Sequence, residues 1–181
     1  MMRPPGSELE AESWAFALEL YARPDVADAC LTLQNEAGVD VMMLLMVTFA
    51  AVKHRRPLTR EEITRLDDLC RPWREQIVWP LRKMRIGLKV GPSPAPSEET
   101  EQFRAKIKSL ELAAERLQNQ LMAESLPLGP PDQEEPISRE RLHAVLVQIV
   151  TVLSNREGQD PTARLSASIE VLVAAALRDA V

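Results

Sequence analysis

A run of twelve almost wholly apolar residues, 41–52, constrains the fold of this chain more than any other feature. Only Thr48 interrupts it. A membrane-spanning helix needs about 20 such residues, so the run is too short to cross a bilayer. A helix that is apolar around its whole circumference must instead be surrounded by other helices. The sequence therefore predicts a buried central helix over residues 39–54. Three of its side chains are expected to be almost fully buried: Leu44, Leu45 and Val47.

The rest of the chain also has helical spacing. It shows no sustained alternation of polar and apolar residues and no Asn-Gly or Asp-Gly turn, so strands are not indicated. Thr59 and Glu62 form a capping-box pattern, and Gly38 suits the left-handed position that ends a helix. The fold class expected is all-α, a helical bundle around the central helix. The helices are predicted at 8–22, 24–37, 39–54, 59–70, 72–89, 98–124, 138–155 and 162–180.

Two proline-rich segments divide the chain. Residues 91–97 alternate proline with small residues, which forbids helix and favours an extended spacer, and residues 126–136 form a second linker. We therefore predict a helical bundle domain over residues 8–90, a linker at 91–97, and C-terminal helices over 98–181. The last part holds a long heptad helix, the second linker and a helical hairpin. These helices either complete the bundle or form a semi-independent module.

The start of the chain and its two cysteines favour a cytoplasmic protein. Glu8, Glu10 and Glu12 occupy the stretch where a signal peptide would carry basic and then apolar residues. Cys30 and Cys70 match no metal-ligand spacing, so we expect two reduced thiols on apolar helix faces. No metal or cofactor is expected.

The net charge of −5 is unevenly distributed. Residues 53–89 carry +6, whereas residues 1–52 carry −6 and residues 90–181 carry −5. At ~100° per residue, the cations of the helix over 72–89 share one sector. Guanidinium groups offer paired donors to carboxylates and phosphates, so this basic stripe is a candidate partner-binding surface. Its residues are Arg71, Arg74, Arg82, Arg85 and Lys89, with Trp79 beside them.

The basic stripe has two alternative interpretations. It is a solvated face, or it pairs with acids of the same protein, for which Glu8, Glu12 and Glu19 of the first helix are the obvious candidates. Pro80 lies inside this helix and should kink it. Direct nucleic-acid binding is disfavoured, because the whole chain is acidic and carries no DNA- or RNA-binding signature.

The helix over 98–124 has apolar residues spaced 4, 3, 4, 3 and 4 apart, which is the seam of a coiled coil. The seam supports either self-association into a homodimer or packing of this helix on the protein's own core. The residues of the candidate self-association seam are Phe103, Ile107, Leu110, Leu117 and Leu121, with Ala114 between them.

Residues able to carry catalysis are scarce. His54 is expected to cap a helix end, and His143 lies in an apolar helix where a structural role is the more common one. Asp67 and Asp68 are expected on a solvated helix face, and Asp40 as a cap or a dipole partner at the start of the central helix. There is no glycine-rich phosphate loop, nucleophile elbow or zinc spacing. No catalytic residues are therefore assigned, and enzyme activity is disfavoured.

Two blocks of the sequence resemble a known family of small proteobacterial proteins, a conserved domain of unknown function. The resemblance covers roughly the first half of the chain, and the part from about Gly91 resembles no family that we can name. The resemblance implies a helical, cytoplasmic bacterial protein and implies no activity. The first block comprises Trp14, Phe16, Ala17, Leu20, Tyr21, Pro24, Val26, Ala29, Cys30, Leu31, Leu33, Gln34, Gly38, Val39, Asp40, Val41, Leu44 and Leu45. The second comprises Trp73, Arg74, Val78, Pro80, Leu81, Arg82, Arg85, Leu88 and Lys89.

These observations predict a non-enzymatic cytoplasmic interaction or accessory protein of unknown pathway. It would bind a protein partner through the basic amphipathic helix or the heptad seam. The alternative is an all-helical enzyme or a protein that binds an apolar ligand. In that case Met42, Met43 and Met46 would line a pocket beside the central helix, although methionine more often fills a core.

Overall fold

The computed structural model describes residues 5–131, 135–154 and 162–179. Within these ranges it contains helices and no strand, so the all-α prediction is confirmed. No helix among the described residues is both long enough and apolar enough to span a membrane. The helices are α1 (Pro5–Tyr21), α2 (Val26–Ala37), α3 (Val41–Lys53), α4 (Arg60–Trp73), the π-helical turn η1 (Arg74–Val78), α5 (Trp79–Gly87), α6 (Glu98–Ser125), α7 (Arg139–Ser154), α8 (Thr162–Ala176) and the 3-10 turn η2 (Leu177–Asp179).

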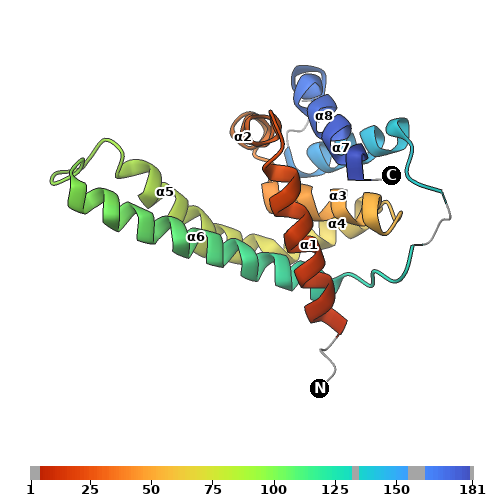
Figure 1. The fold of residues 1–181 in the computed structure, drawn as a ribbon, viewed down its shortest axis with the longest axis horizontal. Coiled ribbons are helices and arrows are strands. Elements are labelled where there is room, and N and C mark those ends of the chain that lie inside the picture. Colours follow the sequence, from red (N-terminus) through yellow and green to blue (C-terminus); the bar gives the residue numbers. More distant parts are fainter. Residues whose placement is uncertain (1–4, 132–134, 155–161, 180–181) are drawn as a thin grey trace.

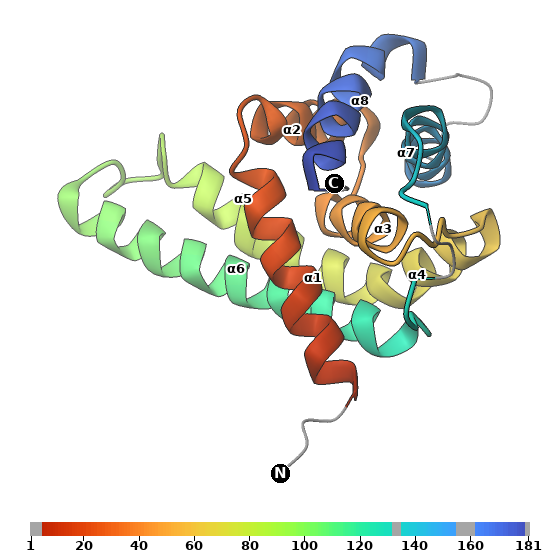
Figure 2. The same ribbon diagram turned by 45° about the vertical axis from the view of Figure 1, so that its right-hand side comes forward.

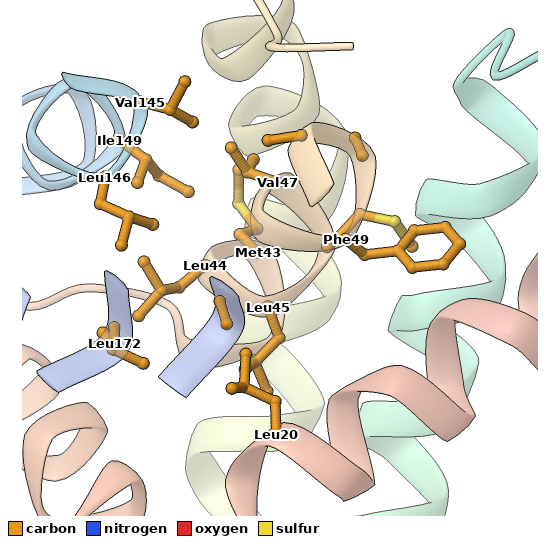
Figure 3. Packing of buried hydrophobic residues seen from close by; sticks show 14 of the residues in the cluster. Leu20, Met43, Leu44, Leu45, Val47, Phe49, Val145, Leu146, Ile149 and Leu172 are labelled. Atoms are coloured by element: carbon orange, nitrogen blue, oxygen red, sulfur yellow. The ribbon is translucent and has the colours of Figure 1, made fainter. Parts of the chain in front are cut away.

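The central position predicted for α3 is confirmed. Leu44, Leu45 and Val47 are buried, as is every residue of α3 from Met42 to Val52. Helices α1, α4, α6 and α7 pack around α3 (Figure 2). Figure 3 shows Leu44 facing Leu146 of α7 and Leu172 of α8. An apolar surface of this extent is covered because leaving each such side chain in water would cost about 1.5–3 kcal/mol.

The helix ends follow the chemistry of their caps. Gly38 has φ 68° and its N–H bonds to Gln34 O, which ends α2 in the left-handed conformation that glycine adopts without strain. Asp40 then begins α3 by accepting a hydrogen bond from Met43 N at 3.2 Å. Thr59 and Glu62 form the predicted capping box at the start of α4. These caps define where α2 ends and where α3 and α4 begin.

One hydrophobic core contains residues from both halves of the chain. Met122 of α6, Leu142 of α7 and Ile169 of α8 belong to the same buried cluster as the side chains of α3. Helix α2 packs on α8, and α3 packs on α7. The later helices therefore complete the bundle that the first half begins. The domain boundaries at 8–90, 91–97 and 98–181 stay a prediction for proteolysis.

Helices α5 and α6 form an antiparallel hairpin that extends away from the other helices (Figure 1). Residues 91–97 turn the chain at its tip. Near its base, the indole Nε1 of Trp73 donates to Ala114 O at 3.0 Å. The sequence places a new helix start at Pro72, and this is wrong: Pro72 lies inside α4, and the helical backbone continues through η1 into α5. Local sequence does not distinguish a proline that begins a helix from one that lies inside it.

Candidate functional site

The backbone changes from α-helical to π-helical at the base of the hairpin. In η1, the N–H of Trp79 bonds to Arg74 O, five residues earlier. Pro80 follows directly and has no N–H to donate to the preceding turn, so the wider turn sits where the α-helical pattern is already interrupted. The π turn thus lies directly before Pro80, and the kink expected at Pro80 stays a prediction. Such turns occur frequently at functional sites.

Arg74 lies at the centre of a buried polar network. It donates from Nη1 to Asp40 Oδ2 at 3.0 Å and from Nη2 to Asp67 Oδ1 at 2.8 Å. Gln118 of α6 donates to the same Asp40 oxygen at 2.7 Å. Arg74 Nε is buried without an acceptor among the described residues. Three elements are therefore joined by one guanidinium: the start of α3, the middle of α4 and, through Asp40, helix α6.

A second network links α5 to α6 across the hairpin. Arg82 donates to Glu111 at 2.8 Å, to Glu115 at 2.6 Å and to Gln34 of α2 at 2.7 Å. Arg85 also donates to Glu111, through Nε and Nη2. Each of the three nitrogens of Arg82 thus has an acceptor within the protein.

The two glutamates of this network have opposite pKa shifts. Burial acts to raise the pKa of Glu111, but hydrogen bonds and charge from Arg85 and Arg82 outweigh it and lower that pKa overall. Burial raises the pKa of Glu115, and the nearby charges of Glu111 and Asp40 add to this effect while Arg82 opposes it. Glu111 is therefore held as a carboxylate, whereas Glu115 is the group in this network that accepts a proton more readily.

The structure settles whether the basic stripe is paired internally. Arg74, Arg82 and Arg85 bond to Asp40, Asp67, Glu111 and Glu115, and Arg71 pairs with Asp67 and Asp68. The sequence suggests Glu8, Glu12 and Glu19 of the first helix as the partners of these arginines. The acids that bind them in the structure are different ones. Lys89 and Trp79 are exposed. A partner-binding role for these six residues stays a prediction.

The members of the heptad seam divide between two environments. Ile107 is buried and Leu121 is half-buried. Three other side chains, spaced seven residues apart, face solvent. We call these three residues the α6 stripe: Phe103, Leu110 and Leu117, which are 56%, 58% and 53% exposed. At its tip, Phe103 lines a shallow hollow with Met84 of α5 and with Leu88, which follows α5.

A half-open pocket of about 500 Å³ lies at the base of the hairpin, between the α2–α3 corner, η1, α5 and α6. Its lining includes the buried Arg74 and Gln118 together with Asp40, whose side chain is 7% exposed, and the exposed Trp79 and Lys83 lie at its open end. The guanidinium of Arg74 lies 5.6 Å from the centre of the Trp79 ring. Of the three methionines considered from sequence, only Met42 lines this pocket, because Met43 and Met46 point into the core.

Comparison with known families gives a match over most of the first two-thirds of the chain. A family model described as a protein of unknown function, DUF2390, matches residues 12–122 of the 181. The chain belongs to the DUF2390 family. No curated protein and no solved structure matches the chain. The family region reaches into α6, further than the resemblance in the first half indicates, so both networks, the pocket and the hairpin up to residue 122 lie within the DUF2390 part.

Several residues of the DUF2390 networks could not be identified as partners from sequence. Asp40 is predicted as a helix cap and proves to be a cap and an arginine partner together. Asp67 is expected on a solvated face, but its side chain is largely covered and binds two arginines, which corrects that expectation. For Glu111 and Glu115 the sequence does contain a pattern that predicts such a role. Two acids four residues apart on a helix, beside an apolar seam, can face one basic neighbour.

The two histidines lie close to protein oxygen atoms, and the two cysteines are buried. The Nδ1 of His54 lies 2.6 Å from Gly129 O, and His143 Nε2 lies 3.4 Å from Glu170. Burial raises the pKa of both Cys30 and Cys70 to about 12, so neither thiol is poised as a nucleophile. Among the described residues, no group of His, Cys, Asp and Glu is arranged to hold a metal ion.

Proposed function

We propose that this protein is a non-enzymatic interaction protein whose α6 stripe binds an amphipathic helix of another protein. The observation that supports the proposal most directly is the exposure of Phe103, Leu110 and Leu117 on a hairpin that extends from the body (Figure 1). Large apolar side chains gathered in a line on an exposed face are a feature of interaction sites.

The spacing of the stripe suits a helical partner. Side chains seven residues apart on a helix recur about every 10 Å along one line, which is the repeat at which the knobs of a second helix insert. Helix-in-groove recognition uses the same spacing of anchors. A strand or an irregular loop would not match three anchors with this repeat.

The charges beside the stripe indicate an acidic partner. Lys106 lies on the same side of α6, between Phe103 and Leu110 in the helical repeat, and Lys89 lies near the tip of the hairpin. Neither cation has an ion pair within the described part of the chain, whereas Arg82 and Arg85 are already paired with Glu111. We therefore expect a partner helix that has an apolar face with acidic residues along its edges. Of the six residues predicted from sequence, Lys89 is the one that we retain for this contact.

The test is capture from an extract of the native host by the immobilised protein. The variant Leu110→Glu with Leu117→Glu should lose the partner, because each glutamate would leave water without a counter-charge. Leu112→Glu is the matched control: Leu112 is 48% exposed and lies on the opposite side of α6. The captured protein should contain an amphipathic helix with acidic edges that binds as a synthetic peptide. Equal capture by all three proteins would contradict the proposal.

A second copy of the chain is the other candidate occupant of the stripe. Light scattering of the wild type at high micromolar concentration decides this point. A dimer that the double variant, but not Leu112→Glu, converts to monomer would replace the partner helix with self-association. A monomer leaves the stripe to another protein.

We also place the protein in the cytoplasm. Two buried cysteines that carry no disulfide support this location, because the cytoplasm keeps thiols reduced. Fractionation of host cells should recover the protein with cytoplasmic markers, and recovery with the cell envelope would contradict the assignment.

A further inference from the structure

We propose that the pocket at the base of the hairpin binds a small organic acid that has an apolar body and a single anionic group. This site is separate from the α6 stripe, so the inference goes beyond the proposed interaction. The pocket volume of about 500 Å³ lies within the range of about 300–1,000 Å³ that is usual for small-molecule sites. Because the pocket is half open, a ligand can enter without unfolding any helix.

The walls provide for the apolar body. Val39, Met42 and Val78 line the deeper part, where all three are buried, and the exposed side chains of Trp79 and Ile86 continue the apolar surface to the opening. An indole at the edge of an apolar cavity suits a chain or a ring laid against its face. The predominance of carbon in the lining, with a few convergent polar groups, is the usual composition of a ligand site.

The charges of the lining determine the sign of the head group. Asp40 binds Arg74 and Glu115 binds Arg82, while Asp67 and Glu111, which also bind these arginines, do not line the pocket. Within the lining, the two acids and the two arginines therefore cancel in charge. Lys83 also lines the pocket, is exposed, and has no ion pair among the described residues. The lining therefore carries one uncompensated positive charge at its open end. A carboxylate placed beside Lys83 would complete the pairing while its apolar body stays inside.

The helix that forms one wall adds to this preference. Val41 and Met42, the first residues of α3, line the pocket, and the N-terminal end of a helix carries partial positive charge. Asp40 caps that end through Met43, so the effect is an addition to the Lys83 charge and does not replace it. A ligand amine would meet Lys83 at the opening and is disfavoured.

The experiment uses octanoate, 1-octanol and octylammonium, which share one apolar chain and differ in charge. Each is titrated into the full-length wild type at constant pH and ionic strength, and binding is followed by calorimetry and by the fluorescence change that Trp79→Phe removes. Octanoate should bind saturably at millimolar concentrations or below, octanol more weakly, and octylammonium most weakly. No saturable binding of octanoate, or equal binding of all three probes, would overturn the proposal.

Two lysine variants then locate the charge. Lys83→Gln should weaken octanoate binding about fivefold, because it removes a cation at a partly open site, and should leave octanol binding unchanged. Lys89→Gln removes an exposed cation that does not line the pocket, and it should leave octanoate binding unchanged. Unchanged octanol binding and circular dichroism show that Lys83→Gln is folded. Octanoate affinity that does not respond to Lys83→Gln, or that falls equally with Lys89→Gln, would refute the assigned head-group site.

Discussion

Replacing Arg74 with methionine should destabilise the fold far more than the same change at Arg71, three residues away. The Arg74 side chain is 9% exposed and holds two carboxylates, one of which, Asp40, is 7% exposed. Methionine retains much of the aliphatic stem of arginine, so the change removes the charge and its hydrogen bonds without opening a large cavity. It leaves a buried carboxylate without its cation.

The expected loss of stability depends on the hydrogen bonds that Asp40 and Asp67 keep in the variant. Removal of one partner of a buried ion pair costs about 3–5 kcal/mol. Here Asp40 keeps hydrogen bonds from Met43 N and Gln118, and Asp67 keeps Arg71. The contact of Arg74 with the exposed Trp79 ring is also lost, and such contacts are worth about 0.5–1 kcal/mol at exposed sites. We therefore expect a loss of about 2–3 kcal/mol in the free energy of unfolding.

Urea denaturation followed by circular dichroism measures this loss. Arg71→Met is the matched control, because the Arg71 side chain is 47% exposed and surface pairs contribute about 0–1 kcal/mol. Adding Asp40→Asn to Arg74→Met should cost less than the sum of the two single losses, since the unpaired charge is then absent. A loss at Arg74 within about 0.5 kcal/mol of that at Arg71 would refute the buried network.

Three further predictions follow from the core and the hairpin. Leu45→Ala should lower the free energy of unfolding in urea by about 2–5 kcal/mol, because Leu45 is 3% exposed within α3, and a loss below about 0.5 kcal/mol would contradict a central α3. Glu111→Gln should destabilise the protein most near neutral pH. Because the folded pKa of Glu111 is lowered from 4.5, its contribution is complete above that value and is lost as the pH falls through the folded pKa, so denaturation curves of wild type and variant should converge in acid. Residues 1–90 expressed alone should lack a cooperative melting transition, because α6, α7 and α8 supply part of the core, and a folded fragment would show that the first domain is independent.

Local pattern was sufficient to predict much of the fold. The apolar run of α3, the left-handed Gly38 and the Thr59 capping box depend on neighbouring residues, and all three are confirmed. Pro72 misled the prediction because a proline in the first turn and one tolerated inside a helix look alike in sequence. The π turn before Pro80 has no periodicity that a short window reveals.

The site is formed by contacts between residues that are far apart in the chain. The spacing of residues along one helix does not predict such contacts. The basic stripe was visible as a sector of cations, but its partners lie far along the chain: Asp40 is 34 residues from Arg74, and Gln118 is 78 residues from Asp40. The heptad pattern showed that α6 is amphipathic. It did not separate Ile107, which is buried, from Leu110, which is exposed, because α5 covers only one side of that seam.

Site-specific photocrosslinking in the native host tests the central claim, that the α6 stripe is the partner-facing surface, most directly. A photoreactive phenylalanine analogue is placed at Leu110, at Leu117 or, as the control, at Leu112, all on the surface of α6. Our account predicts one discrete adduct with the same protein from Leu110 and Leu117 after illumination, and none from Leu112. Adducts from Leu112 alone, or no adduct from the two stripe positions, would contradict it.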